Sequence, residues 1–165
     1  MSKIIVVMGV SGSGKTTLAK AIAAEYKGVF IEGDDFHPTA NIEKMKSGHP
    51  LTDEDRIPWL RILNEKVRED LGETIVLACS ALKQSYRNLI ATNIPSNTLV
   101  WIQLNCDRDI LTDRMKNRSH FMPLSLLQSQ LDTLEPCPNA LVLNSTENTT
   151  QLLQQLKYFI HEQKS

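Results

Sequence analysis

The feature that most restricts how this chain can fold is a glycine-rich loop close to its N-terminus. Residues 9–16 read GVSGSGKT and match the pattern G-x-x-x-x-G-K-[ST] at every fixed position. The apolar run Ile4–Met8 precedes this loop, and a segment with apolar residues at helical spacing follows it. In a strand–loop–helix setting, the pattern is typical of a loop that holds the phosphate groups of a nucleotide.

The chemistry of such a loop explains its residue types. Glycines let successive backbone N–H groups converge on one anion, and the following helix adds the positive end of its dipole. The Lys15 ammonium reaches the β- and γ-phosphates, and the Thr16 hydroxyl is placed to coordinate Mg²⁺. We therefore expect ATP and Mg²⁺ as cofactors. The expected nucleotide-binding residues are Gly9, Val10, Ser11, Gly12, Ser13, Gly14, Lys15, Thr16 and Thr17.

Apolar segments along the chain predict the fold around this loop. Their near-continuous hydrophobicity and β-branched content are typical of parallel strands buried on both faces, and segments with helical spacing separate them. The alternation predicts an α/β, P-loop NTPase-type fold: a doubly wound sheet of about five parallel strands with helices on both faces, in one domain spanning residues 1–165. The predicted strands are Ile4–Met8, Val29–Ile31, Thr74–Ala78, Leu99–Leu104 and, with a weaker pattern, Ala140–Leu143.

Two stretches do not fit the alternation of strands and helices. Residues 34–58 contain three prolines and an acidic cluster, and residues 114–138 combine prolines with basic residues. Each is long enough to be a binding element outside the sheet. We interpret residues 34–58 as a substrate-binding excursion and residues 114–138 as a mobile lid.

Composition argues against several kinds of partner. The net charge of -1 supplies no basic surface for nucleic acid. No apolar run approaches the ~20 residues that span a bilayer. Cys79, Cys106 and Cys137 lack the spacing of a zinc site or a disulfide framework. We expect a cytoplasmic protein with no nucleic-acid or membrane partner.

Other patterns narrow the class of phosphate-loop protein. A GTPase would need a guanine-reading NKxD segment and a D-x-x-G switch, and the sequence contains neither. A motor ATPase usually carries a carboxylate after its third or fourth apolar strand, whereas Thr74–Ala78 runs into the residues CSALK. These differences favour a kinase that acts on a small metabolite.

Several sequence blocks beyond the loop match one family of such kinases. With the loop, the blocks are residues 8–15, Gly33-Asp34 with His37-Pro38, residues 41–45, Gly48 with Pro50-Leu51, Asp53 to Arg56, residues 58–60, residues 79–83, Tyr86-Arg87 and His120-Phe121-Met122. The chain resembles the thermoresistant-type gluconokinases, which phosphorylate D-gluconate on its 6-hydroxyl, and is more distantly similar to shikimate kinases. The resemblance implies conversion of ATP and D-gluconate to ADP and 6-phospho-D-gluconate, with a homodimer possible.

Asp34 follows the predicted strand Val29–Ile31, one strand over from the phosphate loop. Ligands of open α/β sheets bind outside the carboxyl ends of the strands. A carboxylate there can accept the proton of an attacking hydroxyl, although an aspartate also suits a helix N-cap. We expect Asp34 to be the catalytic base, with Asp35 as the competing neighbour. The resemblance to shikimate kinases implies that Glu32 contacts Mg²⁺ through water.

Four further side chains are candidates for contacts with the acid substrate. Pro38 holds His37 extended and close to Asp34. The guanidinium of Arg56 either pairs with neighbouring carboxylates or binds the substrate carboxylate bidentately, as the resemblance implies. Lys83 and Arg87 share a face of the helix expected after Ser80, which would cap that helix; such cations either form a solvated surface or grip the substrate. The expected substrate-binding residues are Asp34, His37, Arg56, Lys83, Arg87 and, in the lid, His120.

Arg114 and Arg118 lie four residues apart at the start of the expected lid. Lid arginines of small P-loop kinases neutralise charge on the transferred phosphoryl group, whereas the alternative is charge on a helix surface. We expect both to be catalytic, together with Lys15 and Asp34. Residues 144–149 are a candidate adenine-binding loop.

Two other functions stay open from the sequence alone. One is another small-molecule kinase, acting on shikimate or a related sugar acid. The other is a non-catalytic nucleotide-binding module that acts through a partner complex. A pure binder would not require Lys15, Thr16, Asp34 and Arg118 together.

Overall fold

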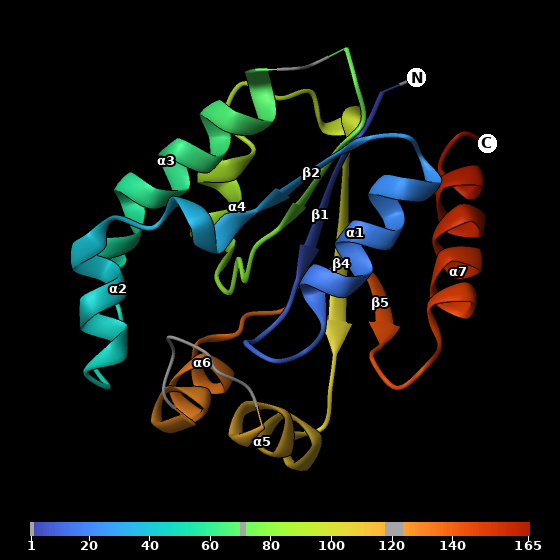
Figure 1. Ribbon diagram of the computed structural model, residues 1–165. Coiled ribbons are helices and arrows are strands. Elements are labelled where there is room, and N and C mark those ends of the chain that lie inside the picture. Colours follow the sequence, from blue (N-terminus) through green and yellow to red (C-terminus); the bar gives the residue numbers. More distant parts are fainter. Residues whose placement is uncertain (1, 70–71, 118–123) are drawn as a thin grey trace.

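A five-stranded parallel sheet lies between two layers of helices (Figure 1). The computed structural model describes residues 2–69, 72–117 and 124–165. The strand order is β2-β3-β1-β4-β5, and every neighbouring pair is parallel. The strands are β1 (Ile4–Met8), β2 (Val29–Glu32), β3 (Ile75–Ala78), β4 (Leu99–Asn105) and β5 (Leu141–Asn144). The predicted fold class is confirmed, and each predicted strand boundary lies within one residue of the observed one.

Alternate side chains of β1 pack into two separate core layers, one on each face of the sheet. Ile4 and Val6 pack in the layer beneath α3 and α4, whereas Ile5 and Val7 pack in the layer beneath α1 and α7. Because successive side chains of a strand point to opposite faces, a central strand covered on both sides must be apolar throughout. These helices are α1 (Lys15–Glu25), α3 (Asp53–Glu69), α4 (Gln84–Ile90) and α7 (Thr149–Glu162).

β2 and β5 are less buried than the central strands. Every residue of β1 and β3 is buried, whereas Val29 of β2 is 36% exposed and Val142 of β5 is 54% exposed. The strand order places β2 and β5 at the two edges of the sheet. The prediction that Val29–Ile31 is buried on both faces is therefore wrong, because an edge strand has a single neighbour and less cover from helices.

The segments beyond the carboxyl ends of the strands carry the candidate site. The phosphate loop follows β1, and α5 and α6 lie beyond the sheet at this end of the molecule (Figure 1). Their bounds, with the remaining elements, are η1 (Gly33–Phe36), α2 (Thr39–Lys46), η2 (Ser96–Thr98), α5 (Arg108–Lys116), η3 (Leu124–Leu126) and α6 (Leu127–Thr133). No helix in the described ranges combines the length and the apolar character needed to cross a membrane. The roles of residues 34–58 and 114–138 as substrate-binding excursion and lid stay predictions.

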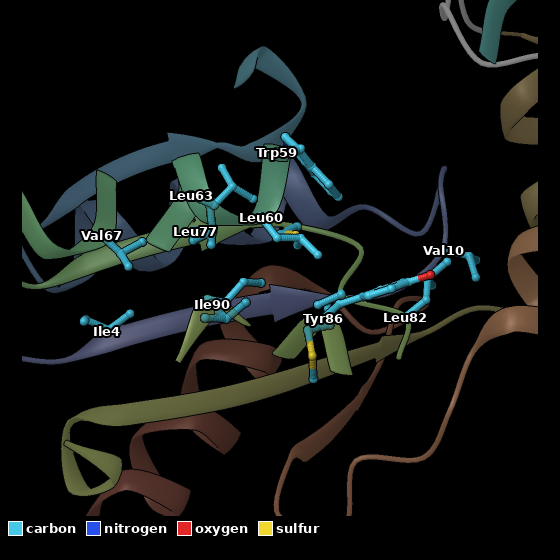
Figure 2. Packing of buried hydrophobic residues seen from close by; sticks show 14 of the residues in the cluster. Ile4, Val10, Trp59, Leu60, Leu63, Val67, Leu77, Leu82, Tyr86 and Ile90 are labelled. Carbon is cyan, nitrogen blue, oxygen red and sulfur yellow. The ribbon is translucent and has the colours of Figure 1, made fainter. Parts of the chain in front are cut away.

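Trp59 joins α3 to the end of β2. Its side chain is 2% exposed, and its Nε1–H donates to the Gly33 carbonyl oxygen at 2.8 Å. Figure 2 shows Trp59 in the layer that also contains Leu60, Leu63 and Tyr86. A buried indole N–H is costly to leave unpaired, so this bond fixes the helix relative to the strand end.

The end of β3 is also tightly packed. Cys79 directly follows β3, is 1% exposed, and carries a free thiol. Burial raises the pKa of this thiol to about 12. Cys106 and Cys137 are free thiols as well, and both are partly exposed.

Gly33 lies so close to the end of β3 that a side chain would not fit. A Cβ atom on Gly33 would lie 2.5 Å from the Ala78 carbonyl oxygen and 3.4 Å from Cys79 Cβ. We expect Gly33→Ala to lower the free energy of unfolding by about 1–3 kcal/mol, measured by urea denaturation, because backbone must move to admit the methyl group. Gly72→Ala is the matched control, because a Cβ there meets no described atom within 4 Å. Equal losses in the two variants would contradict this packing argument.

Candidate active site

The phosphate loop turns sharply between β1 and α1. Gly9 has φ +146° and Gly14, the N-cap residue of α1, has φ +99°, values that favour glycine. A Cβ on Gly9 would lie 2.8 Å from the Leu104 carbonyl oxygen of β4. The helix begins at Lys15, as the sequence predicted, so its N-terminus forms part of the loop. An anion held by this loop would meet backbone N–H groups and the positive end of the helix dipole.

Two side-chain hydrogen bonds lie at the start of α1, one from Lys15 and one from Thr16. Lys15 Nζ donates to the Val10 carbonyl oxygen at 3.0 Å, and Thr16 Oγ1 donates to a carboxylate oxygen of Glu32. Burial raises the pKa of Glu32, and the hydrogen bond from Thr16 opposes that shift. A hydroxyl and a carboxylate are oxygen ligands of the kind Mg²⁺ prefers, so this pair fits the predicted metal. Within the described residues, no cluster of three His, Cys, Asp or Glu side chains could hold a metal by itself.

A cavity beside the loop brings together three of the six residues predicted to contact the acceptor: Asp34, His37 and Arg56. It is lined by Ser11, Lys15, Asp34, His37, Met45, Leu51, Arg56, Trp59, Ser80, Leu82 and Gln130. These residues come from the phosphate loop, the start of α1, α6, the segment after β3, and the stretch from η1 through α2 to α3. We refer to it as the acceptor cavity.

Asp34 and Asp35 differ in their placement. Asp34 lines the acceptor cavity and has a side chain that is 40% exposed, whereas Asp35 is exposed and is not among the lining residues. Asp34 lies inside η1, and the N-cap residue of that turn is Glu32. This geometry favours Asp34 over Asp35 as a base and does not fit the alternative of a helix N-cap.

His37 is a buried, neutral imidazole. Its ring stacks on Trp59 with 3.9 Å between the ring centroids and 19° between the planes. Nδ1 lies 3.5 Å from Asn41 Nδ2, a donor, and Nε2 lies 3.8 Å from Asp34 Oδ1. Burial lowers the pKa of His37 to about 4, although the nearby Asp34 carboxylate opposes this shift. His37 can therefore present an uncharged N–H toward the acceptor cavity at neutral pH.

Arg56 contacts uncharged partners. Its Nη1 donates to the Leu51 carbonyl oxygen at 2.6 Å and to the Tyr86 hydroxyl at 3.1 Å. The neighbouring carboxylates have lysine partners: Asp53 pairs with Lys83 at 3.1 Å, and Asp55 pairs with Lys44 at 2.6 Å. The described ion pairs of the acidic cluster are thus made with lysines. They give no support to the alternative that Arg56 pairs with a neighbouring carboxylate.

The predicted pair Lys83 and Arg87 separates in the structure. Lys83 is the N-cap residue of α4, so Ser80 does not cap that helix and the two cations do not share its face. Arg87 is 1% exposed. Its guanidinium donates to four backbone carbonyl oxygens, those of Ala81, Leu82, Glu135 and Pro136. The prediction of a substrate contact for Arg87 is corrected: its donors join the segment after α6 to the segment after β3.

Arg114 of α5 lies against the phosphate loop. Its Nη1 lies 3.2 Å from the carbonyl oxygens of both Gly12 and Ser13. A second cavity next to the loop is lined by Ser13, Gly14, Thr17, Leu18, Leu104, Arg114, Ser145, Glu147, Thr149 and Leu152. This cavity includes part of the candidate adenine loop 144–149, and among the described residues Ser145 Oγ is buried without a hydrogen-bond partner. The predicted site residues Arg118 and His120 lie outside the described residues.

Sequence reasoning missed three side chains that line the acceptor cavity or contact residues of its lining. Tyr86 donates to Asp53 Oδ1 at 2.5 Å and accepts from Arg56. Asn41 contacts His37, and Gln130 of α6 accepts a hydrogen bond from the Ser11 N–H at 2.7 Å. Tyr86 and Asn41 stand in sequence blocks that matched a known family, so a signal was present for them. Gln130 had no local signal.

Comparison with known proteins agrees with this arrangement. The protein family described as AAA domain matches residues 4–137. The gluconokinase of Gluconobacter oxydans (strain 621H) is 48% identical over 137 residues, which cover 81% of this chain and 75% of that protein. The thermoresistant gluconokinase of Escherichia coli (strain K12) is 42% identical over 135 residues, covering 80% and 76%. The crystal structure of a gluconokinase from Sinorhizobium meliloti 1021 is 40% identical, with a TM-score of 0.84 over 97% of this chain and 92% of that one.

The parallel sheet, the phosphate loop after β1 and the acidic turn after β2 define a P-loop kinase that uses ATP. Identity of 40–48% to curated relatives across most of the chain then decides the family. The chain belongs to the gluconokinase family, as the sequence resemblance predicted.

The burial of His37 predicts a pH dependence of stability. The folded protein has a His37 pKa of about 4, below the ordinary value of 6.5, so between these values the unfolded chain binds the proton more readily. The free energy of unfolding should therefore fall as the pH drops from about 6.5 to about 4, by on the order of 3 kcal/mol. His37→Phe keeps an aromatic ring over Trp59 and cannot titrate, so its loss over this pH range should be smaller. Parallel pH curves for the two proteins, from urea denaturation, would contradict the prediction.

Proposed function

We propose that this protein transfers the γ-phosphoryl group of ATP to the 6-hydroxyl of D-gluconate, giving ADP and 6-phospho-D-gluconate. The observation that carries the proposal is the acceptor cavity, where the carboxylate of Asp34 and the guanidinium of Arg56 lie on the same side of the phosphate loop as Lys15. The names of the curated relatives support gluconate as the acceptor.

Residues of the phosphate loop bind the nucleotide in this proposal. The N–H groups of this loop that are not already paired within the protein, as those of Gly9, Ser11 and Ser13 are, hold the β- and γ-phosphates together with the Lys15 ammonium. The cavity beside Arg114 and Ser145 receives the adenine ring. Thr16 would hold Mg²⁺, with Glu32 binding its hydration water, and the ion would neutralise charge on the β- and γ-oxygens.

Asp34 acts as the base on the acceptor side. Its carboxylate accepts the proton of the 6-hydroxyl as the hydroxyl oxygen bonds to the γ-phosphorus and the bond to the β–γ bridging oxygen breaks. Arg56 binds the gluconate carboxylate, and its contacts with Leu51 and Tyr86 fix the plane of its guanidinium. His37 donates to a substrate hydroxyl, and Lys83, paired with Asp53, adds positive charge.

The lid, residues 114–138, would supply the remaining charge. Arg114 already contacts the loop, and Arg118 and His120 are assigned to transition-state stabilisation and substrate binding respectively. Closure of the lid excludes water, which otherwise competes with gluconate as the acceptor. We place the kinase in the cytoplasm as a single domain of residues 1–165, with a homodimer possible and no nucleic-acid partner.

A panel of acceptors tests the proposed function directly. Purified protein with ATP and Mg²⁺ should release ADP when D-gluconate is present and far less with D-glucose or shikimate. D-glucose has the same 6-hydroxyl but no carboxylate, so it tests the assignment of Arg56. If shikimate were the only acceptor that supported ADP release, the proposed substrate would be shikimate and not gluconate. ATP binding without turnover on any acceptor would favour a nucleotide-binding module.

Replacing the base tests the role of Asp34. Asn at this position keeps the size of the side chain and removes its charge and its ability to accept a proton. Because general-base assistance contributes roughly 10²–10⁴-fold, kcat should fall by about that factor in Asp34→Asn, with little change in ATP affinity. Asp35→Asn is the matched control, because Asp35 is exposed and outside the cavity lining. If kcat fell strongly in Asp35→Asn and only slightly in Asp34→Asn, the catalytic base would be Asp35.

A further inference from the structure

One hydrogen bond joins helix α6 to the phosphate loop. Gln130 is 8% exposed, and its Oε1 accepts a buried hydrogen bond from the Ser11 N–H at 2.7 Å. The two residues are 119 positions apart in the sequence. A buried backbone N–H is costly to leave unpaired, so this contact constrains the loop.

The peptide that Gln130 holds also contacts Lys15. The Ser11 N–H and the Val10 carbonyl belong to one planar peptide unit, whose geometry is rigid. Gln130 accepts from the N–H end, and Lys15 Nζ donates to the carbonyl end at 3.0 Å. The same carbonyl accepts from the Ser13 N–H at 3.2 Å. Rotation of this peptide would therefore move the acceptor to which the Lys15 ammonium is bound.

Helix α6 is itself anchored, so that it can hold Gln130 in a fixed place. The Glu135 N–H donates to the Leu82 carbonyl oxygen at 2.7 Å, and Glu135 Oε1 accepts from the Gln84 N–H at 2.9 Å. Arg87 donates to the carbonyl oxygens of Glu135 and Pro136, and Leu127 of α6 is buried in the core layer beneath α3 and α4. Gln130 thus reaches the loop from an ordered segment and also lines the acceptor cavity.

Within the proposed phosphoryl transfer, we propose that Gln130 is a positioning residue that sets the place of the Lys15 ammonium through the Val10–Ser11 peptide. No local sequence motif marks this residue. Loss of its acceptor oxygen should free the peptide to rotate, so that Lys15 meets the γ-phosphate less well. The effect should fall on kcat, because Lys15 opposes the negative charge that develops at the β–γ bridging oxygen as its bond to the γ-phosphorus breaks.

Amide hydrogen exchange and kinetics on the whole protein test this inference. Gln130→Met keeps the length of the side chain and removes the acceptor, so Ser11 amide exchange should accelerate at least fivefold. The kcat should fall roughly tenfold, a larger change than that in the KM for gluconate. Gln130→Glu keeps an acceptor oxygen and should keep Ser11 protected. Gln128→Met, an exposed position on the same helix, is the matched control and should change neither quantity.

The two measurements separate this inference from the proposed function. Exchange of the Ser11 amide does not depend on which acceptor the kinase uses, so it decides the Gln130 contact even if gluconate proves to be the wrong substrate. Unchanged Ser11 exchange in Gln130→Met would overturn the inference. Equal loss of Ser11 protection in Gln130→Glu and Gln130→Met would also overturn it, because the acceptor oxygen would then not matter. Should Gln130→Met fail to fold, Gln130→Ala, which also removes the acceptor oxygen, decides through its Ser11 exchange.

Discussion

The site depends on three parallel strands that end in register. Val7 of β1 and Glu32 of β2 both pair with Ala78 of β3, so the three strand ends lie at one level of the sheet. Each strand then continues into a segment that contributes to the site: the phosphate loop, η1 and the residues after Cys79. Parallel pairing therefore places a phosphate-binding loop, a carboxylate and the wall of a cavity at one edge, whereas antiparallel strands would send them to opposite edges. Across the intervening β3, the Glu32 side chain still reaches Thr16.

The strands could be predicted from the sequence because burial imposes a simple pattern. Residues packed between two helix layers are apolar without interruption, and this pattern located β1 and β3. The exposure of Val29 could not be predicted in the same way. Its segment is as apolar as a central strand, and only the order of strands places it at an edge. Strand order follows from long-range packing, which local hydrophobicity does not encode.

The residues of the candidate site also divide into those whose positions could be predicted from the sequence and those whose positions could not. The positions of Lys15 and Thr16 at the start of α1 could be predicted from the G-x-x-x-x-G-K-[ST] pattern. That of Asp34 could be predicted because it lies two residues after β2. The buried position of Arg87 could not be predicted, since two of its four carbonyl partners lie 48 and 49 residues away. From the sequence, a basic residue beside a strand end is as compatible with a substrate contact as with the buried contacts that Arg87 makes. Gln130 has its partner 119 residues away, so no local spacing marks it.

The thiol of Cys79 is expected to react only slowly with electrophiles, although it lies next to the candidate site. The residue stands directly before Ser80, which lines the acceptor cavity, yet its thiol is 1% exposed and has a pKa of about 12. At neutral pH this thiol is protonated, whereas the thiolate is the form that alkylating agents and peroxides attack. Cys106 and Cys137, both partly exposed, would react first. A sulfur atom next to the chemistry is thus shielded from oxidative damage by the packing that holds the strand ends together.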